Sequence, residues 1–457
     1  MNNKRVLVVG LGRSGVASAL FLQSRGAKVT VSDSKPEDQL RQEIPVLLDH
    51  GIAVETGRHG ERTFQNQDMI VVSPGVPFDA QPLVQARALG EQVIGEIELA
   101  AEFLSGPIVA ITGSNGKTTT TTLVGEILAK SGRKTLVGGN IGTPAVSLVA
   151  KATPETVTVL EVSSFQLETI RTFHPKIAVV LNVTPDHLDR HRTFEAYAGA
   201  KARIFENQQE HDVAVLNADD PTCVAMAGQI KAPVFWFNRK REVDHGTFLR
   251  QGMVQFRGES SEREIMPVAE VPLKGAHNVE NVLAAICAAE LMGCQADSIR
   301  TAVREFKAVE HRLEYVATVR GVEYYNDSKA TNVDATIKAL EAFSGGLHVI
   351  LGGKDKGSDY STLVPFLRAR ARRVYTIGAA AAKIESQISG SVDIFRAENL
   401  ERAVKEAARQ ATAGEVVLLA PACASFDQFE NFEQRGRVFK DLVRALGEES
   451  DFRSRAG

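Results

Sequence analysis

The chain has 457 residues, which is too long for one ordinary domain and indicates about three. Apolar residues make up 44% and charged residues 24%, as in average globular proteins, which excludes a largely disordered chain. The formal net charge of -3 argues against a nucleic-acid or anionic-membrane binder, and no apolar run is long enough to span a bilayer. Because the N-terminal MNNKRVLVVG leads directly into a strand and does not form a signal peptide, we expect a cytoplasmic protein.

The chain begins with a glycine turn typical of nucleotide binding. The strand-like RVLVV is followed by Gly10, Gly12 and Gly15 in G-x-G-x-x-G spacing, then by the helical ASALFLQSRG and the strand AKVTVSD, which ends at Asp33. Such glycines let the backbone approach a phosphate at a helix N-terminus, and the acid suits a ribose. The hexapeptide alone is a weak signal, so it indicates a nucleotide without requiring NAD.

Strand-like and helix-like segments alternate along most of the chain, which predicts an α/β fold with largely parallel sheets. The pair Gly106 and Pro107 separates a first block, residues 1–106, from a central block, residues 107–309. The segment EHRLEYVATVRGVEYYND resembles a hairpin and opens a third block, residues 310–457. The four cysteines form no C-x-x-C pair, so we expect them to be reduced and mostly buried.

The strongest chemical signal is the segment IVAITGSNGKTTTTTLVGEILAKSG, which predicts a strand, a glycine-rich turn and an amphipathic helix. In such a turn, backbone amides hold phosphate oxygens, the lysine reaches the β and γ phosphates, and the next hydroxyl ligates Mg²⁺. The segment departs from G-x-x-x-x-G-K-[ST], because Ile111 occupies the first glycine position. The predicted ATP-binding residues of this turn are Gly113, Ser114, Asn115, Gly116, Lys117, Thr118 and Thr119.

Two more strands of the central block offer partners for this turn. Glu161 ends one strand, and Asp186, His187 and His191 follow another. Since the carboxyl ends of parallel strands meet in one crevice, we expect these groups near the phosphates. One hydroxyl and one carboxylate suit Mg²⁺, whereas Leu188 occupies the position where a zinc protease motif needs glutamate. His191 is therefore interpreted as a surface or helix-capping residue.

A series of segments together resembles the Mur ligases, the ATP-dependent amide-bond-forming enzymes of peptidoglycan synthesis. In chain order they are TGSNGKTT, EVSSFQLE, NVTPDHLDRH, YAGAKARIFENQ, GAHNVENVLAA, EHRLE, NDSKATNVDAT and PACASFDQFENFEQRG. The resemblance covers nearly the whole chain. NDSKATN and ACASFDQFENFEQRG are most similar to the member that adds D-glutamate, and the chain lacks the D-N-P-R segment of the diamino-acid-adding relative.

This resemblance implies three domains: a Rossmann-like N-terminal domain for a UDP substrate, a P-loop ATPase-type central domain and a Rossmann-like C-terminal domain for the incoming amino acid. It implies an ATP- and Mg²⁺-dependent ligase of peptidoglycan synthesis that uses UDP-N-acetylmuramoyl-L-alanine and D-glutamate. The acyl carboxylate would be phosphorylated, and the amine would then displace phosphate. The first glycine turn would hold a pyrophosphate, so NAD is not implied, and we expect a monomer with no nucleic-acid partner.

The resemblance also assigns binding residues. The expected UDP-substrate contacts are Gly12, Arg13, Ser14, Asp33, Ser34, Ser73, Gly75, Asn140, Ser163 and His187. Further ATP contacts are expected at Asn278, Asn281, Arg312 and Asp327. The expected D-glutamate contacts are Thr331, Lys356, Ser425 and Phe432. GGKDKG aligns ambiguously, so Lys354 could take the place of Lys356, and asparagines such as Asn278 and Asn281 are more often helix caps.

The catalytic and metal residues follow from the same motifs. Those expected to act in catalysis are Lys117, Glu161, His187, Lys201 and Lys329. The expected metal-binding residues are Thr118, Glu161, His187 and Lys201. By pattern alone Lys201 would be a solvated residue on a helix, whereas the resemblance implies a carbamylated lysine whose carbamate approaches a second metal.

Three other functions are compatible with parts of the sequence. A sister ligase such as folylpolyglutamate synthetase shares the P-loop and the domain order but does not need the first UDP-type domain. A nucleotide-dependent regulatory module would bind ATP without releasing phosphate. An NAD oxidoreductase would bind NAD at residues 1–106.

Overall fold

The computed structural model describes residues 1–307 and 309–455. The chain forms two compact units, Met1–Val271 with Glu280–Glu305 and Pro272–Val279 with Phe306–Gly457. Three sheets, two in the first unit and one in the second, confirm the α/β fold class. The predicted boundaries of the three blocks stay a prediction.

The first sheet has five parallel strands in the order β3-β2-β1-β4-β5. Its strands are β1 (Arg5–Val9), β2 (Lys28–Ser32), β3 (Ala53–Glu55), β4 (Met69–Val72) and β5 (Val93–Gly95). Its helices are α1 (Arg13–Ser24), α2 (Glu43–Leu48), α3 (Gln81–Ala88) and α4 (Glu96–Ala101). The short strand β5 was not identified from the sequence.

The second sheet has the order β14-β13-β12-β11-β10-β9-β6-β8-β7. Its parallel strands are β6 (Ile108–Thr112), β7 (Thr135–Gly139), β8 (Val157–Glu161), β9 (Ile177–Val180), β10 (Val213–Asn217), β11 (Val234–Asn238) and β12 (Gly246–Arg250). The strands β6, β8 and β9 are buried throughout, as expected for parallel strands that are covered on both faces.

The far edge of the second sheet is an antiparallel extension that the sequence pattern did not reveal. The strands β13 (Met253–Arg257) and β14 (Glu262–Pro267) follow β12 in hairpin connections. The first hairpin turns at Gln251 and Gly252, which both have positive φ, as a two-residue hairpin turn requires. The helices of this region are α5 (Lys117–Lys130), α6 (Ser164–Leu167), α7 (Leu188–His191), α8 (Phe194–Ala202), α9 (Pro221–Ala227), α10 (Ala276–Leu291) and α11 (Ala296–Glu305).

Two buried glutamates of α4 join the first sheet to the second. Glu96 accepts a 2.7 Å hydrogen bond from the backbone N–H of Val146, which lies in the 3-10 helix η3 (Ala145–Lys151). Glu98 accepts hydrogen bonds from the backbone N–H groups of Thr172 and Phe173 at 2.7 and 3.0 Å. Because these carboxylates satisfy backbone donors of the second sheet's connections, they fix α4 against that sheet.

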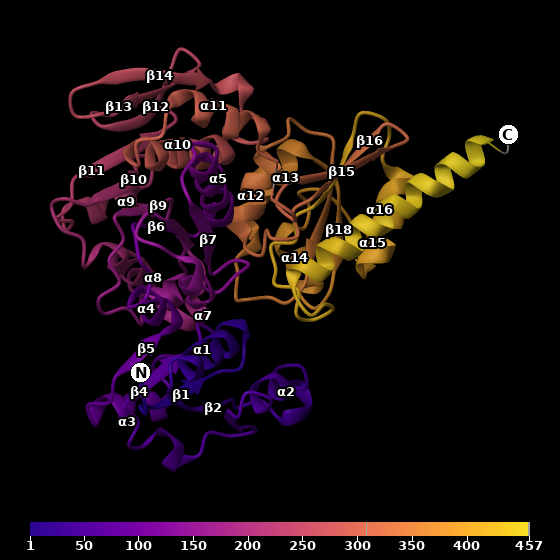
Figure 1. Ribbon diagram of the computed structural model, residues 1–457. Helices are drawn as coiled ribbons and strands as arrows, with labels where there is room; N and C mark the ends of the chain where they lie inside the picture. Colours follow the sequence, from indigo (N-terminus) through magenta and orange to yellow (C-terminus); the bar gives the residue numbers. More distant parts are fainter. Residues whose placement is uncertain (308, 456–457) are drawn as a thin grey trace. The chain divides into compact units, whose positions relative to one another are not determined.

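The sheet of the second unit has the order β15-β16-β20-β17-β18-β19. Its strands are β15 (Glu314–Val319), β16 (Val322–Asn326), β17 (Leu347–Gly352), β18 (Ala371–Ile377), β19 (Asp393–Glu398) and β20 (Val416–Leu419). Its helices are α12 (Val333–Glu341), α13 (Val364–Arg370), α14 (Ala381–Ile388), α15 (Leu400–Gln410) and α16 (Phe432–Arg455), the long yellow helix of Figure 1. The antiparallel pair β15 and β16 confirms the predicted hairpin.

All four cysteines are free and buried, which confirms the expectation from their spacing. Among the residues that the structure describes, no helix has both the length and the hydropathy needed to cross a membrane.

Candidate functional site

The N-terminal glycine turn is held in place by its neighbours. Gly10 has φ +93°, and a Cβ on Gly15 would lie 1.8 Å from the carbonyl oxygen of Gly10, so helix α1 packs closely on the turn. The Ser73 hydroxyl donates to the Gly10 carbonyl at 2.9 Å, and the Leu11 N–H donates to the Asp33 carboxylate at 2.6 Å. Ser73 and Asp33 therefore shape the turn itself, and the expected contact of Asp33 with a ribose stays a prediction.

The outer side of this turn is open to a ligand. The exposed members of the predicted UDP-substrate set in this region are Gly12, Arg13, Ser34 and Gly75, while Ser14 is half-buried. A rigid turn with an exposed glycine suits a pyrophosphate that lies against the backbone.

The P-loop connects β6 to α5 and depends on two glycines with positive φ, +155° at Gly113 and +85° at Gly116. A Cβ on Gly116 would lie 2.1 Å from Oδ1 of Asn281, so the helix α10 asparagine reaches this loop. Lys117 folds back over the turn, and its Nζ donates to the carbonyl oxygens of Gly113 and Ser114 at 2.9 Å each. The predicted phosphate-binding turn is thus formed, with its ammonium group directly above it.

A clamp from the segment after β9 holds the P-loop. Asn182 makes a reciprocal pair with the backbone of Asn115, accepting at 2.9 Å and donating at 3.1 Å. The Ser114 hydroxyl donates to the Thr184 carbonyl and accepts from the Thr184 N–H, both at 2.9 Å, and it also contacts the Tyr197 hydroxyl at 3.0 Å. Sequence reasoning missed Asn182 and Tyr197, although both lie in the quoted motifs.

A hydroxyl and a carboxylate meet at the start of α5. The Thr118 hydroxyl donates to Oε2 of Glu161 at 2.8 Å, and the Asn140 amide donates to Oε1 of the same carboxylate at 3.0 Å. Glu161 is buried at the end of β8, next to the P-loop strand. This pair of oxygen donors suits Mg²⁺, which takes few protein oxygens and keeps several waters.

Lys201 is buried, unlike the solvated residue that its pattern alone predicts, and its role in a metal site stays a prediction. Its Nζ donates to the Gly113 carbonyl oxygen at 2.8 Å and lies 4.6 Å from the centre of the Tyr197 ring. Burial, and after it the positive charge of Lys117, lowers the pKa of the Lys201 amine well below its ordinary value. The helix α8 thus brings a second amine to the carbonyl that Lys117 also contacts.

The two histidines after β9 have different environments. His187 precedes the short helix α7 with φ +54°, is partly exposed, and its ring lies 5.0 Å from that of Phe165. His191 was expected to be a surface or helix-capping residue. It ends α7 but is buried, where it stacks on Phe165 and contacts the Ser164 hydroxyl at 3.0 Å. Burial lowers the pKa of His191, which favours a neutral packing residue there.

The predicted substrate residue Ser163 begins helix α6 in a capping box. Its hydroxyl accepts from the Gln166 N–H at 3.3 Å, while the Ser163 N–H donates to the Gln166 side chain at 2.9 Å. This local arrangement fixes the backbone at the end of β8, close to Glu161.

In the second unit, the predicted D-glutamate residues follow three adjacent strands, β16, β20 and β17. Lys329 and Thr331 come after β16, Ser425 after β20 and Lys356 after β17. Nζ of Lys329 lies 5.1 Å from the centre of the Phe432 ring, at the start of α16. Parallel topology therefore gathers these groups at one sheet edge.

The loop with the two alternative lysines gives them different exposures. Lys354 pairs its backbone with Ala424 in both directions, at 2.8 and 3.2 Å, and its side chain is exposed. Lys356 is half-buried in the same loop. The choice of Lys356 over Lys354 as a ligand stays a prediction.

Three other predicted ATP residues lie in the second unit. Asp327 is buried and accepts a 3.2 Å hydrogen bond from the Leu313 N–H, and burial raises its pKa to about 6. Arg312 is half-buried, and Asn278 donates to the Lys274 carbonyl at 2.7 Å, as a residue near a helix start commonly does. Their roles in ATP binding stay predictions.

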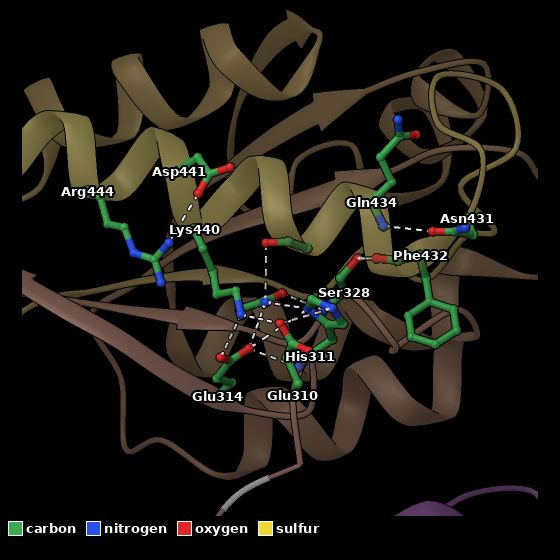
Figure 2. Close-up of polar contacts among 12 residues, drawn as sticks. Glu310, His311, Glu314, Ser328, Asn431, Phe432, Gln434, Lys440, Asp441 and Arg444 are labelled. Carbon is green, nitrogen blue, oxygen red and sulfur yellow. Dashed lines mark hydrogen bonds and ion pairs between the residues drawn. The ribbon is translucent and has the colours of Figure 1, made fainter. Parts of the chain in front are cut away.

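Figure 2 shows a polar cluster around Glu310, His311, Glu314 and Lys440. Lys440 of α16 donates to Glu314 at 3.0 Å and also contacts Glu310. Glu314 accepts from the His311 N–H at 2.9 Å, and the His311 carbonyl accepts from the Lys329 N–H at 3.1 Å. The EHRLE motif thus holds the backbone of a predicted catalytic lysine.

Comparisons with known proteins cover most of the chain. The Mur ligase MurD-like N-terminal domain matches residues 4–95, the Mur ligase middle domain matches residues 111–289, and the Mur ligase glutamate ligase domain matches residues 311–423. The chain is 66% identical over 449 residues to the UDP-N-acetylmuramoylalanine--D-glutamate ligase of Koribacter versatilis (strain Ellin345), covering 98% of this chain and 99% of that protein. It is 57% identical over 447 residues to the ligase of the same name from Acidobacterium capsulatum, covering 97% of each.

Solved structures share the fold at low identity. The MurF ligase from Thermotoga maritima in complex with ADP has a TM-score of 0.62 at 19% identity, covering 97% of this chain and 96% of that one. The pseudomurein peptide ligase type C from Methanothermus fervidus has a TM-score of 0.61 at 20% identity, covering 97% of this chain and 100% of that one.

Proposed function

Since the chain belongs to the Mur ligase family, we propose that it joins D-glutamate to UDP-N-acetylmuramoyl-L-alanine and converts ATP to ADP and phosphate. The observation that carries this function is the gathering of Lys117, Thr118, Glu161 and Lys201 around one P-loop. The first glycine turn would hold the UDP part of the substrate, and the edge of the second unit's sheet would hold the amino acid. The cytoplasmic location and the monomeric state stay predictions.

The first step that we propose is phosphorylation of the substrate's alanyl carboxylate. A carboxylate is a poor electrophile, and transfer of the γ-phosphoryl group of ATP converts it into an acyl phosphate. Charge builds on the phosphoryl oxygens, so the backbone amides at the start of α5 and the Lys117 ammonium stabilise the transition state. Asn182 binds both backbone groups of Asn115 and so keeps the loop in position before ATP binds.

The second step is attack of the D-glutamate amine on the acyl carbon, with release of phosphate from a tetrahedral intermediate. A dicarboxylate needs donors at both ends, and Lys329, Thr331, Lys356 and Ser425 supply ammonium and hydroxyl groups at one edge. The ring of Phe432 lies beside Lys329 and limits the space around it.

Mg²⁺ would be held by Thr118 and Glu161 and would neutralise phosphate charge when bound. By family resemblance, His187 and a carbamylated Lys201 would serve a second metal. The burial of Lys201 and its lowered pKa support the modification, because only a neutral amine reacts with carbon dioxide.

Phosphate release from ATP tests this function directly. The purified protein is given UDP-N-acetylmuramoyl-L-alanine with D-glutamate, L-glutamate or L-lysine in parallel. We expect release only with D-glutamate. Release with a folate substrate in place of the UDP substrate would instead identify a folylpolyglutamate synthetase, and ATP binding without release would identify a regulatory module.

A further inference from the structure

The second unit contains a guanidinium group that none of the predicted roles uses. Arg435 lies in the first turns of α16 and is fully buried, at 0% exposure. Its hydrogen-bond acceptors are carbonyl and hydroxyl oxygens, and within the described chain it forms no ion pair with a carboxylate. Burying such a charge is costly without a specific compensating arrangement, so its position needs a physical explanation.

The partners of Arg435 belong to the loops that carry the predicted D-glutamate residues. Its Nη2 donates to the carbonyl of Ser328 at 2.8 Å, and its Nε donates to the Ser328 hydroxyl at 3.0 Å. Nη1 and Nη2 each donate to the carbonyl of Cys423 at 3.2 Å. Ser328 directly precedes Lys329, and Cys423 lies two residues before Ser425.

The same guanidinium connects to two more elements of the predicted site. The Ser328 hydroxyl donates to the Phe432 carbonyl at 2.8 Å, a contact drawn in Figure 2. A Cβ on Gly353 would lie 2.2 Å from the Ala424 carbonyl and 3.2 Å from Nη1 of Arg435, so the loop after β17 packs against the group. One side chain therefore touches the loops after β16, β20 and β17.

Only a guanidinium fits this arrangement. It offers five donors in one plane on three nitrogens, whereas a lysine carries its three donors on one nitrogen and cannot reproduce the separate contacts of Nε, Nη1 and Nη2. Burial lowers the pKa of Arg435 to about 10, which still leaves it protonated at neutral pH. The guanidinium therefore stays charged next to these loops, where the Asp427 carboxylate offsets part of its charge.

We propose that Arg435 is a positioning residue of the D-glutamate site, which sets the loops of Lys329, Ser425 and Lys356 by its hydrogen bonds to them. This inference rests on the proposed function and extends it to a residue that does not touch the substrate. It predicts that loss of Arg435 raises KM for D-glutamate and leaves KM for ATP and for UDP-N-acetylmuramoyl-L-alanine nearly unchanged.

The test measures KM for D-glutamate, for UDP-N-acetylmuramoyl-L-alanine and for ATP in Arg435→Met and Arg435→Lys. We expect Arg435→Met to raise KM for D-glutamate by about tenfold or more, because groups displaced from their binding positions hold the substrate less well. The KM values for the other two substrates should change by less than about twofold. Arg435→Lys keeps the positive charge but lacks the planar set of guanidinium donors. Its KM for D-glutamate should therefore lie between those of the methionine variant and the unchanged protein.

The matched control is Phe439→Leu, since Phe439 is a buried residue one turn further along α16 that packs in the core. It should lower the melting temperature and leave KM for D-glutamate unchanged. If Arg435→Met does not fold, Ser328→Ala removes one acceptor and should raise KM for D-glutamate by about threefold. Unchanged KM for D-glutamate in the folded Arg435 variants and in Ser328→Ala would overturn the proposal. Failure of the proposed function would appear separately, as no D-glutamate-dependent phosphate release by the unchanged protein.

Discussion

The Thr118 hydroxyl donates a 2.8 Å hydrogen bond to Oε2 of Glu161 and thereby joins the start of α5 to the end of β8. Glu161→Gln keeps the size of the side chain and removes its charge. We expect turnover to fall by about 10²–10³-fold, because a charged oxygen donor is lost. The Mg²⁺ concentration that gives half-maximal turnover should rise for the same reason. Phosphate release measured over a range of Mg²⁺ concentrations checks this, with Glu126→Gln on α5 as the control. Normal turnover in Glu161→Gln would remove this carboxylate from the metal site.

Lys117 and Lys130 stand at opposite ends of α5, which makes them a matched pair. Lys117→Met removes the ammonium above the P-loop, so we expect turnover to fall by about 10²–10³-fold. Lys130 pairs with Glu305 at the surface, and Lys130→Met should leave turnover within about twofold, since exposed pairs contribute little. Steady-state phosphate release compares the two. A fully active Lys117→Met variant would contradict the proposed phosphate site.

Much of this molecule follows from local sequence patterns. The P-loop conformation depends on Gly113 and Gly116 at fixed spacing between a strand and a helix, and that spacing is visible in the sequence. The position of Glu161 follows from topology, because parallel strands end at one edge. The antiparallel strands β13 and β14 were not predicted from the sequence, because short hairpins give only a weak period-two pattern.

The other features depend on contacts between distant segments. No local pattern indicates that Lys201 lies beneath Gly113 or that His191 packs on Phe165, because burial of a polar helix residue is decided by what covers it. Asn182 and Arg435 likewise acquire their roles from loops elsewhere in the chain. Family resemblance identified Lys201, whereas the contacts of Asn182 and Arg435 required the three-dimensional structure.

Carbamylation of Lys201 can be observed without an activity assay. Protein equilibrated with ¹³C-labelled bicarbonate should give a carbamate carbon resonance, because the buried amine is easily deprotonated and can react with carbon dioxide. The resonance should be absent in Lys201→Met and present in Lys130→Met. An unchanged protein without this resonance would show that the lysine acts as a free amine.

Glu96 of α4 is buried at 1% exposure and accepts a hydrogen bond from η3. Burial raises its pKa from 4.5 to about 7, so between these values the folded protein keeps a proton that the unfolded chain releases. The free energy of unfolding should therefore fall as the pH rises from 4.5 to 7, by about 3 kcal/mol, and then level off. Glu96→Gln cannot titrate and should lack this fall. Urea unfolding followed by fluorescence of Trp236, the single tryptophan and a residue of the first unit, compares the two proteins at pH 4.5 and 8. Equal pH dependence in both proteins would mean that Glu96 stays ionised in the fold.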